Sequence, residues 1–165
     1  MHRSGRAWEG APMVTGNVVF TLNGAPVEVP ADGCSLLEAL RDRLGLRSAK
    51  DGCSPQGQCG CCTVWVDGQP RVACVTPVAR VSGRAVTTVE GLADAAEWGQ
   101  RFCAAGASQC GFCTPGQLMA AVGLLKDNPH PSREEARQAM SGNLCRCGNY
   151  DNYLNGVMRV AGSNS

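Results

Sequence analysis

Eight of the eleven cysteines in this 165-residue chain fall into two groups whose spacing is typical of metal ligands. The first group follows C-x5-C-x2-C-x11-C, and the second follows C-x2-C-x31-C-x-C within "QCGFCTPG" and "GNLCRCGNY". Thiolates are the soft ligands that zinc and iron–sulfur clusters prefer. The candidate ligands are Cys53, Cys59, Cys62 and Cys74 in the first group, and Cys110, Cys113, Cys145 and Cys147 in the second.

The first group has the arrangement of a plant-type [2Fe–2S] site, in which a short loop supplies three thiolates and a hairpin returns a fourth. Gly52, Gly57 and Gly60 lie in this loop. Glycine lets the backbone wrap closely around an anionic cluster and direct N–H groups at its sulfurs. The spacing therefore favours an iron–sulfur cluster over a zinc knuckle at this site.

The second group begins directly before a predicted helix that starts near Pro115. A helix N-terminus offers unpaired N–H groups and a partial positive charge, which suit an anionic cluster. Structural zinc held by four cysteines uses the same C-x2-C pairs. Spacing alone therefore leaves zinc and iron–sulfur open for this second group.

Cysteines this dense could instead form disulfides, but several features argue against it. The count of eleven is odd, and the N-terminus has basic residues without the apolar segment of a secretory signal. No apolar run approaches the roughly 18 residues of a membrane span. We expect a cytoplasmic protein with reduced thiols. The remaining cysteines are expected to pack in the core or in loops: Cys34, Cys61 and Cys103.

The other residues predict no substrate chemistry on this chain. The net charge of +1 and the absence of basic runs indicate neither a nucleic acid nor an anionic membrane as partner. His2 and His130 are expected to be solvated, and no G-x-G-x-x-G, P-loop or H-E-x-x-H motif is present. Arg146 lies between two candidate ligands, where its positive charge would raise a cluster potential or contact a partner. The alternative is a solvated loop residue.

The first half of the chain predicts a small α+β sheet domain. "NG" and "DG" turns separate alternating apolar segments, and Ser35 with Glu38 has the pattern of a helix capping box. The predicted strands cover 17–22, 26–29 and two runs within 63–75, and the predicted helix covers 35–45. The segment 85–92 ends this half of the chain.

The second half predicts a compact bundle of four short helices. Capping boxes are expected at Thr114 with Gln117 and at Ser132 with Glu135. The second and third helices would form an antiparallel hairpin that returns the last two cysteines to the first two. The predicted helices cover 94–106, 114–127, 132–140 and 152–162.

The whole chain is predicted to divide into a tail at 1–15, a sheet domain at 16–92 and a helical domain at 93–162. Residues 162–165 are expected to form a loose end.

Over residues 17–161, the motifs "GQCGCCTVWVDGQPRVAC", "QCGFCTPG" and "GNLCRCGNY" resemble the small iron–sulfur subunit of the xanthine oxidase family of molybdenum hydroxylases. The resemblance implies a plant-ferredoxin-like β-grasp domain followed by a four-helix domain, each with one [2Fe–2S] cluster. It also implies partner subunits that carry molybdopterin cytosine dinucleotide and FAD, assembled as a dimer of heterotrimers. Such complexes hydroxylate aldehydes, purines or other N-heterocycles, or oxidise carbon monoxide. Gln109 matches the family glutamine that contacts the pterin, and Cys147 matches the cysteine that lies beside it.

The chain departs from the family pattern at three places. Five residues separate Cys53 from Cys59 where the family usually has four, Cys61 stands where a small residue is usual, and "CGNY" replaces "CTGY". None of these removes a ligand, although the longer loop puts the N–H contacts and potential of that cluster in doubt. The resemblance favours an electron-transfer subunit. The alternatives are a diffusible ferredoxin, which its near-neutral charge disfavours, and a zinc-stabilised interaction module.

Overall fold

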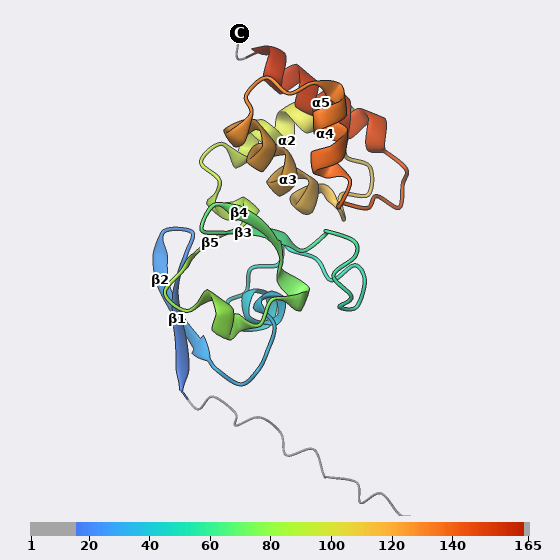
Figure 1. Ribbon diagram of the computed structural model, residues 1–165. Coiled ribbons are helices and arrows are strands. Elements are labelled where there is room, and N and C mark those ends of the chain that lie inside the picture. The colour runs from blue at the N-terminus through green and yellow to red at the C-terminus, as the bar shows by residue number, and fades with distance from the viewer. Residues whose placement is uncertain (1–15, 164–165) are drawn as a thin grey trace, which may run out of the picture.

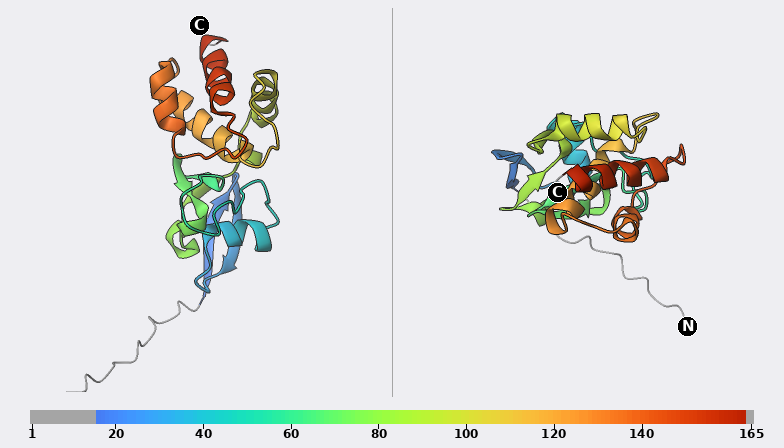
Figure 2. Two further views of the ribbon diagram at one scale, coloured as in Figure 1. Left: turned by 90° about the vertical axis from the view of Figure 1, so that its right-hand side faces the viewer. Right: turned by 90° about the horizontal axis from the view of Figure 1, so that it is seen from above.

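The computed structural model describes residues 16–163, so the expectations for the tail at 1–15 and for residues 164–165 lie outside the described residues. Figure 1 shows a sheet-containing half and a helical half, with the described C-terminal end on the side of the helices away from the sheet. The left view of Figure 2 shows the same separation into two halves, and in the right view, seen from above, the helices lie over the sheet half. The predicted division of the chain into a domain at 16–92 and a domain at 93–162 stays a prediction.

The first half is built on a five-stranded sheet with the order β2-β1-β5-β3-β4. β1 pairs in parallel with β5, and the other neighbours are antiparallel. Both hairpins turn through two residues with positive φ, namely Asn23-Gly24 and Asp67-Gly68, as the "NG" and "DG" signals predicted. The strands are β1 (Asn17–Leu22), β2 (Ala25–Pro30), β3 (Thr63–Val66), β4 (Gln69–Val72) and β5 (Ala85–Thr87).

One helical segment covers this sheet and is more irregular than the sequence predicted. α1 (Leu36–Glu38) begins at Ser35, whose Oγ accepts a hydrogen bond of 3.1 Å from the N–H of Glu38. It continues as a π-helical turn, Ala39–Arg43, before Gly45 turns the chain at a φ of 71°. The segment buries its leucines against the alternating inward residues of β1, so helix and sheet share one core: Val18, Phe20, Leu22, Leu36, Leu37 and Leu40.

The second half consists of the four predicted helices, with ends that differ by up to two residues. Its core gathers around Phe102 and Val157, both completely buried. Among the residues that the structure describes, no helix is long and apolar enough to cross a membrane. The helices are α2 (Ala95–Ala104), α3 (Thr114–Asp127), α4 (Arg133–Met140) and α5 (Tyr150–Ser163).

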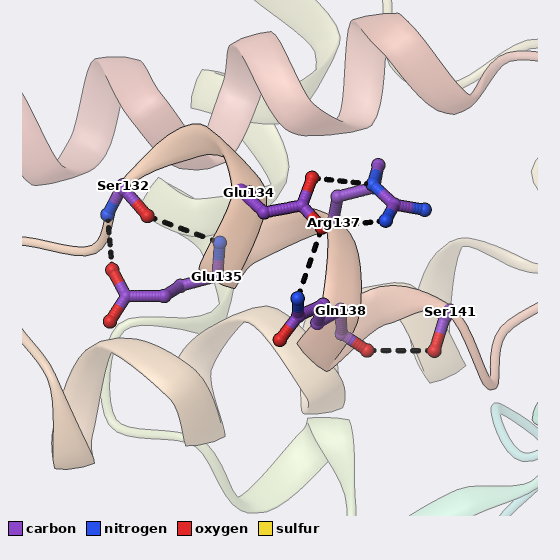
Figure 3. A network of polar contacts seen from close by, with 6 residues as sticks. All are labelled: Ser132, Glu134, Glu135, Arg137, Gln138 and Ser141. Atoms are coloured by element: carbon purple, nitrogen blue, oxygen red, sulfur yellow. Dashed lines mark hydrogen bonds and ion pairs between the residues drawn. The ribbon is translucent and has the colours of Figure 1, made fainter.

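The start of α4 follows the sequence prediction, as Figure 3 shows. The Ser132 Oγ accepts from the N–H of Glu135 at 3.2 Å, and the Glu135 carboxylate accepts from the N–H of Ser132 at 2.7 Å. Both bonds of the predicted capping box are therefore present.

The capping box predicted for α3 is wrong. The hydroxyl of Thr114 lies 2.9 Å from that of Tyr153, while the Gln117 Nε2 donates to the carbonyl of Asn143 at 2.9 Å. Cys113 occupies the N-cap position and makes no side-chain capping bond. Tertiary partners have taken both side chains that local spacing assigned to the helix start.

The two halves are joined by buried polar contacts. The Trp65 indole N–H on β3 donates to the Met119 carbonyl on α3 at 3.0 Å, and the Lys126 Nζ lies 5.6 Å from the centre of the Trp65 ring. The Asn143 amide, after α4, donates to the Gly60 carbonyl at 2.9 Å. These bonds hold the loop between α4 and α5 against the cysteine-rich loop of the sheet half.

Candidate metal centres

The β3–β4 hairpin brings together two cysteines of the first group. Cys62 directly precedes β3, and Cys74 lies in a 3-10 turn after β4. The antiparallel register pairs Thr63 with Val72, and the N–H of Ala73 donates to the Cys62 carbonyl at 3.2 Å. The two thiols consequently lie close enough to interact.

The cysteine-rich loop brings Cys53 and Cys59 together as a second pair of interacting thiols. Backbone N–H groups of Gln58, Cys59 and Gln56 point at the Cys53 sulfur and lower the pKa of its thiol to about 6. The Gln56 N–H lies 3.3 Å from that sulfur. The five-residue gap thus still wraps its backbone around a thiolate, which is the form that binds metal.

The second group also meets as two pairs, at one end of the helical half. Cys113 at the start of α3 interacts with Cys145, and Cys110 interacts with Cys147. The hairpin of α3 and α4 returns the second two cysteines to the first two, as predicted. Cys113 and Cys145 are buried, whereas Cys110 and Cys147 are exposed. This site is therefore open to solvent on one side.

Both tyrosines of the chain lie at this second site, and the sequence analysis missed them. The Tyr150 hydroxyl accepts from the N–H of Cys145 at 3.0 Å, and the Tyr153 hydroxyl lies 3.4 Å from the Cys113 sulfur. The available signal was their shared position in "GNYDNY", directly after the last candidate ligand, in a chain with few aromatic residues.

All eleven cysteines are free thiols, so the disulfide alternative is not what the structure shows. Burial raises the pKa of Cys62 to about 12 and that of Cys113 to about 11. Ligation requires the thiolate, so a metal bound here would displace protons from buried thiols.

The thiols meet two by two, and this arrangement fits a binuclear cluster. Within residues 16–163, no three His, Cys, Asp or Glu side chains converge closely enough to hold a single metal ion. A [2Fe–2S] cluster takes four cysteines, two for each iron. Each half thus supplies two cysteine pairs, which is the number of thiolates that one such cluster takes.

The two cysteine groups lie next to each other across the contact between the halves. The N–H of Leu144, one residue before Cys145, donates to the carbonyl of Cys59 at 2.8 Å. Cysteines of both groups line one cavity of about 650 Å³. A Cβ added to Gly116 would lie 2.3 Å from the Gly60 carbonyl oxygen, so the loops approach more closely than a side chain would allow.

The remaining predicted residues are placed as follows. Cys34 and Cys61 are buried as expected, but Cys103 is exposed on α2, against the expectation of packing. Gln109 and Arg146 are exposed beside the second group. His130 is exposed as expected, and His2 lies outside the described residues.

The chain is an iron–sulfur protein of two [2Fe–2S]-binding domains. Residues 20–79 match the family described as "2Fe-2S iron-sulfur cluster binding domain", and residues 88–158 match "[2Fe-2S] binding domain". The fold class expected from the sequence is confirmed.

Relatives of known activity then specify the family. The chain is 42% identical to the α subunit of isoquinoline 1-oxidoreductase of Brevundimonas diminuta, over 87% of this chain and 97% of that one. It is 44% identical to one of the subunits of nicotinate dehydrogenase of Pseudomonas putida, over 87% and 94%. The crystal structure of quinoline 2-oxidoreductase from Pseudomonas putida 86 superposes with a TM-score of 0.83, at 39% identity, covering 90% of this chain and 94% of that chain.

The chain belongs to the iron–sulfur subunits of the xanthine oxidase family of molybdenum hydroxylases. It is thus part of an oxidoreductase complex, as the motifs "QCGFCTPG" and "GNLCRC" indicated.

Proposed function

We propose that this chain relays single electrons through two [2Fe–2S] clusters, from a molybdopterin cytosine dinucleotide site on a large subunit to FAD on a medium subunit. Cys53, Cys59, Cys62 and Cys74 would hold one cluster, and Cys110, Cys113, Cys145 and Cys147 would hold the other. Hydroxylation of a C–H bond with oxygen from water releases two electrons and two protons. Each cluster accepts one electron at a time. The substrate chemistry therefore belongs to the partner subunit, and this chain transfers the electrons.

The observation that carries this proposal is the direct link between the two cysteine groups. The hydrogen bond from the Leu144 N–H to the Cys59 carbonyl joins one candidate ligand to the residue next to another. An electron can therefore pass between the two sites through a few covalent bonds and one hydrogen bond of 2.8 Å. A chain serving only a structural role would not need its two metal sites in contact.

The direction of the relay is taken from the resemblance to the family, in which the helical-domain cluster lies near molybdenum. Cys110 and Cys147 of this site are exposed and Cys113 and Cys145 are buried, whereas in the first group Cys53 is partly exposed and Cys59, Cys62 and Cys74 are buried. We assign the helical-domain site as the one that faces the molybdenum centre, with Gln109 as a contact to the pterin. Gln109 is exposed next to Cys110, where a partner's cofactor can reach it.

The chemistry of the substrate is proposed from the relatives. Isoquinoline, nicotinate and quinoline, which appear in the names of the three relatives described above, are all N-heterocycles. We assign the complex to hydroxylation of an aromatic N-heterocycle or a related aldehyde, in the cytoplasm, as a dimer of heterotrimers.

Metal analysis and electron paramagnetic resonance (EPR) spectroscopy of the complex test this function. We expect about four iron and about four sulfide per chain, two of each for every [2Fe–2S] cluster, and two distinguishable S = 1/2 signals after reduction. Purification of the tagged chain should bring a molybdenum-containing subunit with it.

The alternatives give different results. Zinc without an EPR signal would indicate a structural metal module and end the electron-transfer proposal. Two iron–sulfur signals in a chain that purifies without any molybdenum-containing partner would instead favour a diffusible carrier.

A further inference from the structure

A chain of three side-chain hydroxyls ends at the sulfur of Cys113, one of the four candidate ligands of the helical half. The Ser108 Oγ lies 3.1 Å from the Thr114 Oγ1, and the Thr114 Oγ1 lies 2.9 Å from the Tyr153 hydroxyl. The Tyr153 hydroxyl lies 3.4 Å from the Cys113 Sγ. In each of these three contacts either atom could be the donor. The direction of the chain therefore depends on whether the sulfur carries a proton.

A metal-bound Cys113 would fix this direction, because a ligating cysteine is a thiolate and can only accept. A tyrosine hydroxyl keeps its single proton at neutral pH. A hydrogen bond to a charged acceptor is stronger than one to a neutral hydroxyl, so Tyr153 donates to the sulfur and its oxygen accepts from Thr114. The Thr114 Oγ1 can then accept from Ser108. All three hydroxyl protons point along the chain toward the thiolate.

The Tyr153 ring is held in place by packing that does not involve its hydroxyl. Its centroid lies 5.8 Å from that of Phe102, and the Phe102 centroid lies 6.0 Å from that of Trp98. Both pairs are tilted, an arrangement that aromatic rings prefer to a face-to-face sandwich. Tyr153 is 2% exposed and Phe102 is completely buried. The core of the helical half therefore holds the hydroxyl at the sulfur, and a phenylalanine would keep the same ring contacts.

The chain runs from the surface into the interior of the helical half. Ser108 and Thr114 are half-buried, whereas Cys113 and Tyr153 are buried. In such a low-dielectric interior a hydrogen bond is electrostatically stronger than in water, and successive hydroxyls polarise one another. The bond from the phenol to the sulfur is thus reinforced by the two hydroxyls behind it.

A donor at a ligand sulfur shifts the reduction potential of a cluster in a definite direction. Hydrogen bonds to the sulfurs are among the factors that set the potential of an iron–sulfur cluster. Reduction adds one negative charge, so an O–H group stabilises the reduced state more than the oxidised state. The midpoint potential is therefore higher with the donor than without it.

We propose that Tyr153 donates a hydrogen bond to the Cys113 thiolate of the helical-domain cluster, oriented by Thr114 and Ser108, and thereby raises the reduction potential of that cluster. The step concerned is the gain of one electron, in which the hydroxyl keeps its proton and no covalent bond forms or breaks. A higher potential favours transfer of an electron to this cluster from the molybdenum site. The inference rests on the proposed function, because it requires a cluster at these cysteines.

The test is a redox titration of the purified complex followed by EPR, which gives the midpoint potential of each of the two signals separately. The signal that Cys110→Ser removes is assigned to the helical domain. Tyr153→Phe removes the hydroxyl and keeps the ring. Thr114→Val removes the hydroxyl that orients the phenol, and Thr114→Ser is its matched control because it retains that hydroxyl. The sheet-domain signal serves as the internal control, and iron content is recorded for each preparation.

We expect Tyr153→Phe to lower the equilibrium constant for reduction of the helical-domain cluster by about fivefold to tenfold, the effect of one hydrogen bond. A tenfold change corresponds to about 59 mV for a one-electron couple. Thr114→Val should cause a smaller fall in the same direction, and Thr114→Ser should keep the wild-type potential. The potential of the sheet-domain signal should stay the same in all three variants.

An unchanged potential in cluster-loaded Tyr153→Phe would overturn the inference. Equal falls at both clusters would also overturn it, because a general loosening of the fold would produce them. If Tyr153→Phe loses the helical-domain signal, the two Thr114 variants decide: a fall in Thr114→Val alone supports the inference, and equal potentials in both contradict it. Failure of the proposed function would appear separately, as a wild-type complex without two iron–sulfur signals.

Discussion

At the scale of single residues, the cysteines divide into ligand pairs and bystanders. Each candidate ligand interacts with another candidate ligand of its own group, while Cys61 also interacts with Cys59 and Cys103 is exposed on α2 outside both groups. The division can be tested one residue at a time, because a [2Fe–2S] cluster depends on all four thiolates.

Cys110→Ser should abolish one of the two EPR signals and retain the other, with iron falling from about four to about two per chain. The physical reason is that serine oxygen is a harder and poorer ligand for an iron–sulfur cluster than thiolate. Cys103→Ser is the control, and it should retain both signals. A Cys110→Ser protein with both signals intact would remove Cys110 from the ligand set.

Cys61→Ala should retain both clusters, although Cys61 lies between two candidate ligands in the chain. Burial raises the pKa of the Cys61 thiol to about 12, and its sulfur faces the carbonyls of Cys59 and Leu144 at 3.8 and 3.9 Å. We therefore expect a protonated thiol that fills space between the two groups. The check is iron content together with EPR, and loss of the ferredoxin-type signal would show that Cys61 is a ligand in place of Cys62.

The approach of Cys74 to Cys62 across a hairpin was predictable from sequence, but the environment of the cysteines was not. Spacing alone put Cys62 and Cys74 at opposite ends of a hairpin, which brings such residues together whatever the rest of the fold does. The Tyr153 hydroxyl at Cys113 depends on where α5 returns after a long excursion of the chain. No local rule links residues so far apart, so this contact required the structure, whereas Tyr150 contacts Cys145 from only five residues away.

At the scale of elements, the short helix α4 depends on its N-terminal cap. A helix of eight residues makes too few intrahelical hydrogen bonds to be stable alone. The two hydrogen bonds of the Ser132–Glu135 capping box pair N–H groups that have no partner within the helix. The same pairing lowers the pKa of Glu135, through the backbone N–H of Ser132. The cap helps to hold α4 in place, and the loop after α4 carries Cys145 and Cys147.

Ser132→Ala should lower the free energy of unfolding by about 1 kcal/mol, the usual effect of losing such a cap. Thermal unfolding followed by circular dichroism measures it. Ser82→Ala, at an exposed serine of the sheet half, should change the value by less than about 0.5 kcal/mol. An equal loss in both variants would mean that the cap itself contributes nothing specific.

Prediction of the elements succeeded where local patterns act alone. β1 was predicted with its observed limits because its alternation and the "NG" turn are local signals. The helix predicted over 35–45 became a short α-helix with a π-helical turn, and the cap predicted for α3 was replaced by bonds to Tyr153 and Asn143. In the α3 case a tertiary contact took a side chain that the local rule had assigned elsewhere.

At the scale of the whole molecule, two domains that each form their own core are joined at the place where their cysteine loops meet. The Asn143 side chain donates to the Gly60 carbonyl, and its backbone carbonyl accepts from Gln117. Asn143 is 5% exposed, so both bonds are shielded from water. Asn143 is therefore one of the residues of the helical domain that hold the two proposed cluster sites next to each other.

Asn143→Ala should loosen this contact without removing any ligand. The lost hydrogen bond is expected to cost about 1–2 kcal/mol at a buried site, and the backbone bond from Gln117 remains possible. We expect a weaker magnetic interaction between the two reduced clusters in EPR, and a thermal unfolding transition that separates into two steps. Asn155→Ala is the matched control, because Asn155 accepts from Arg133 on the surface of the helical domain alone. A single unfolding transition and an unchanged EPR interaction in Asn143→Ala would contradict this prediction. The relative position of the clusters would then be set by the Trp65–Met119 contact and by the close packing of the loops at Gly60 and Gly116.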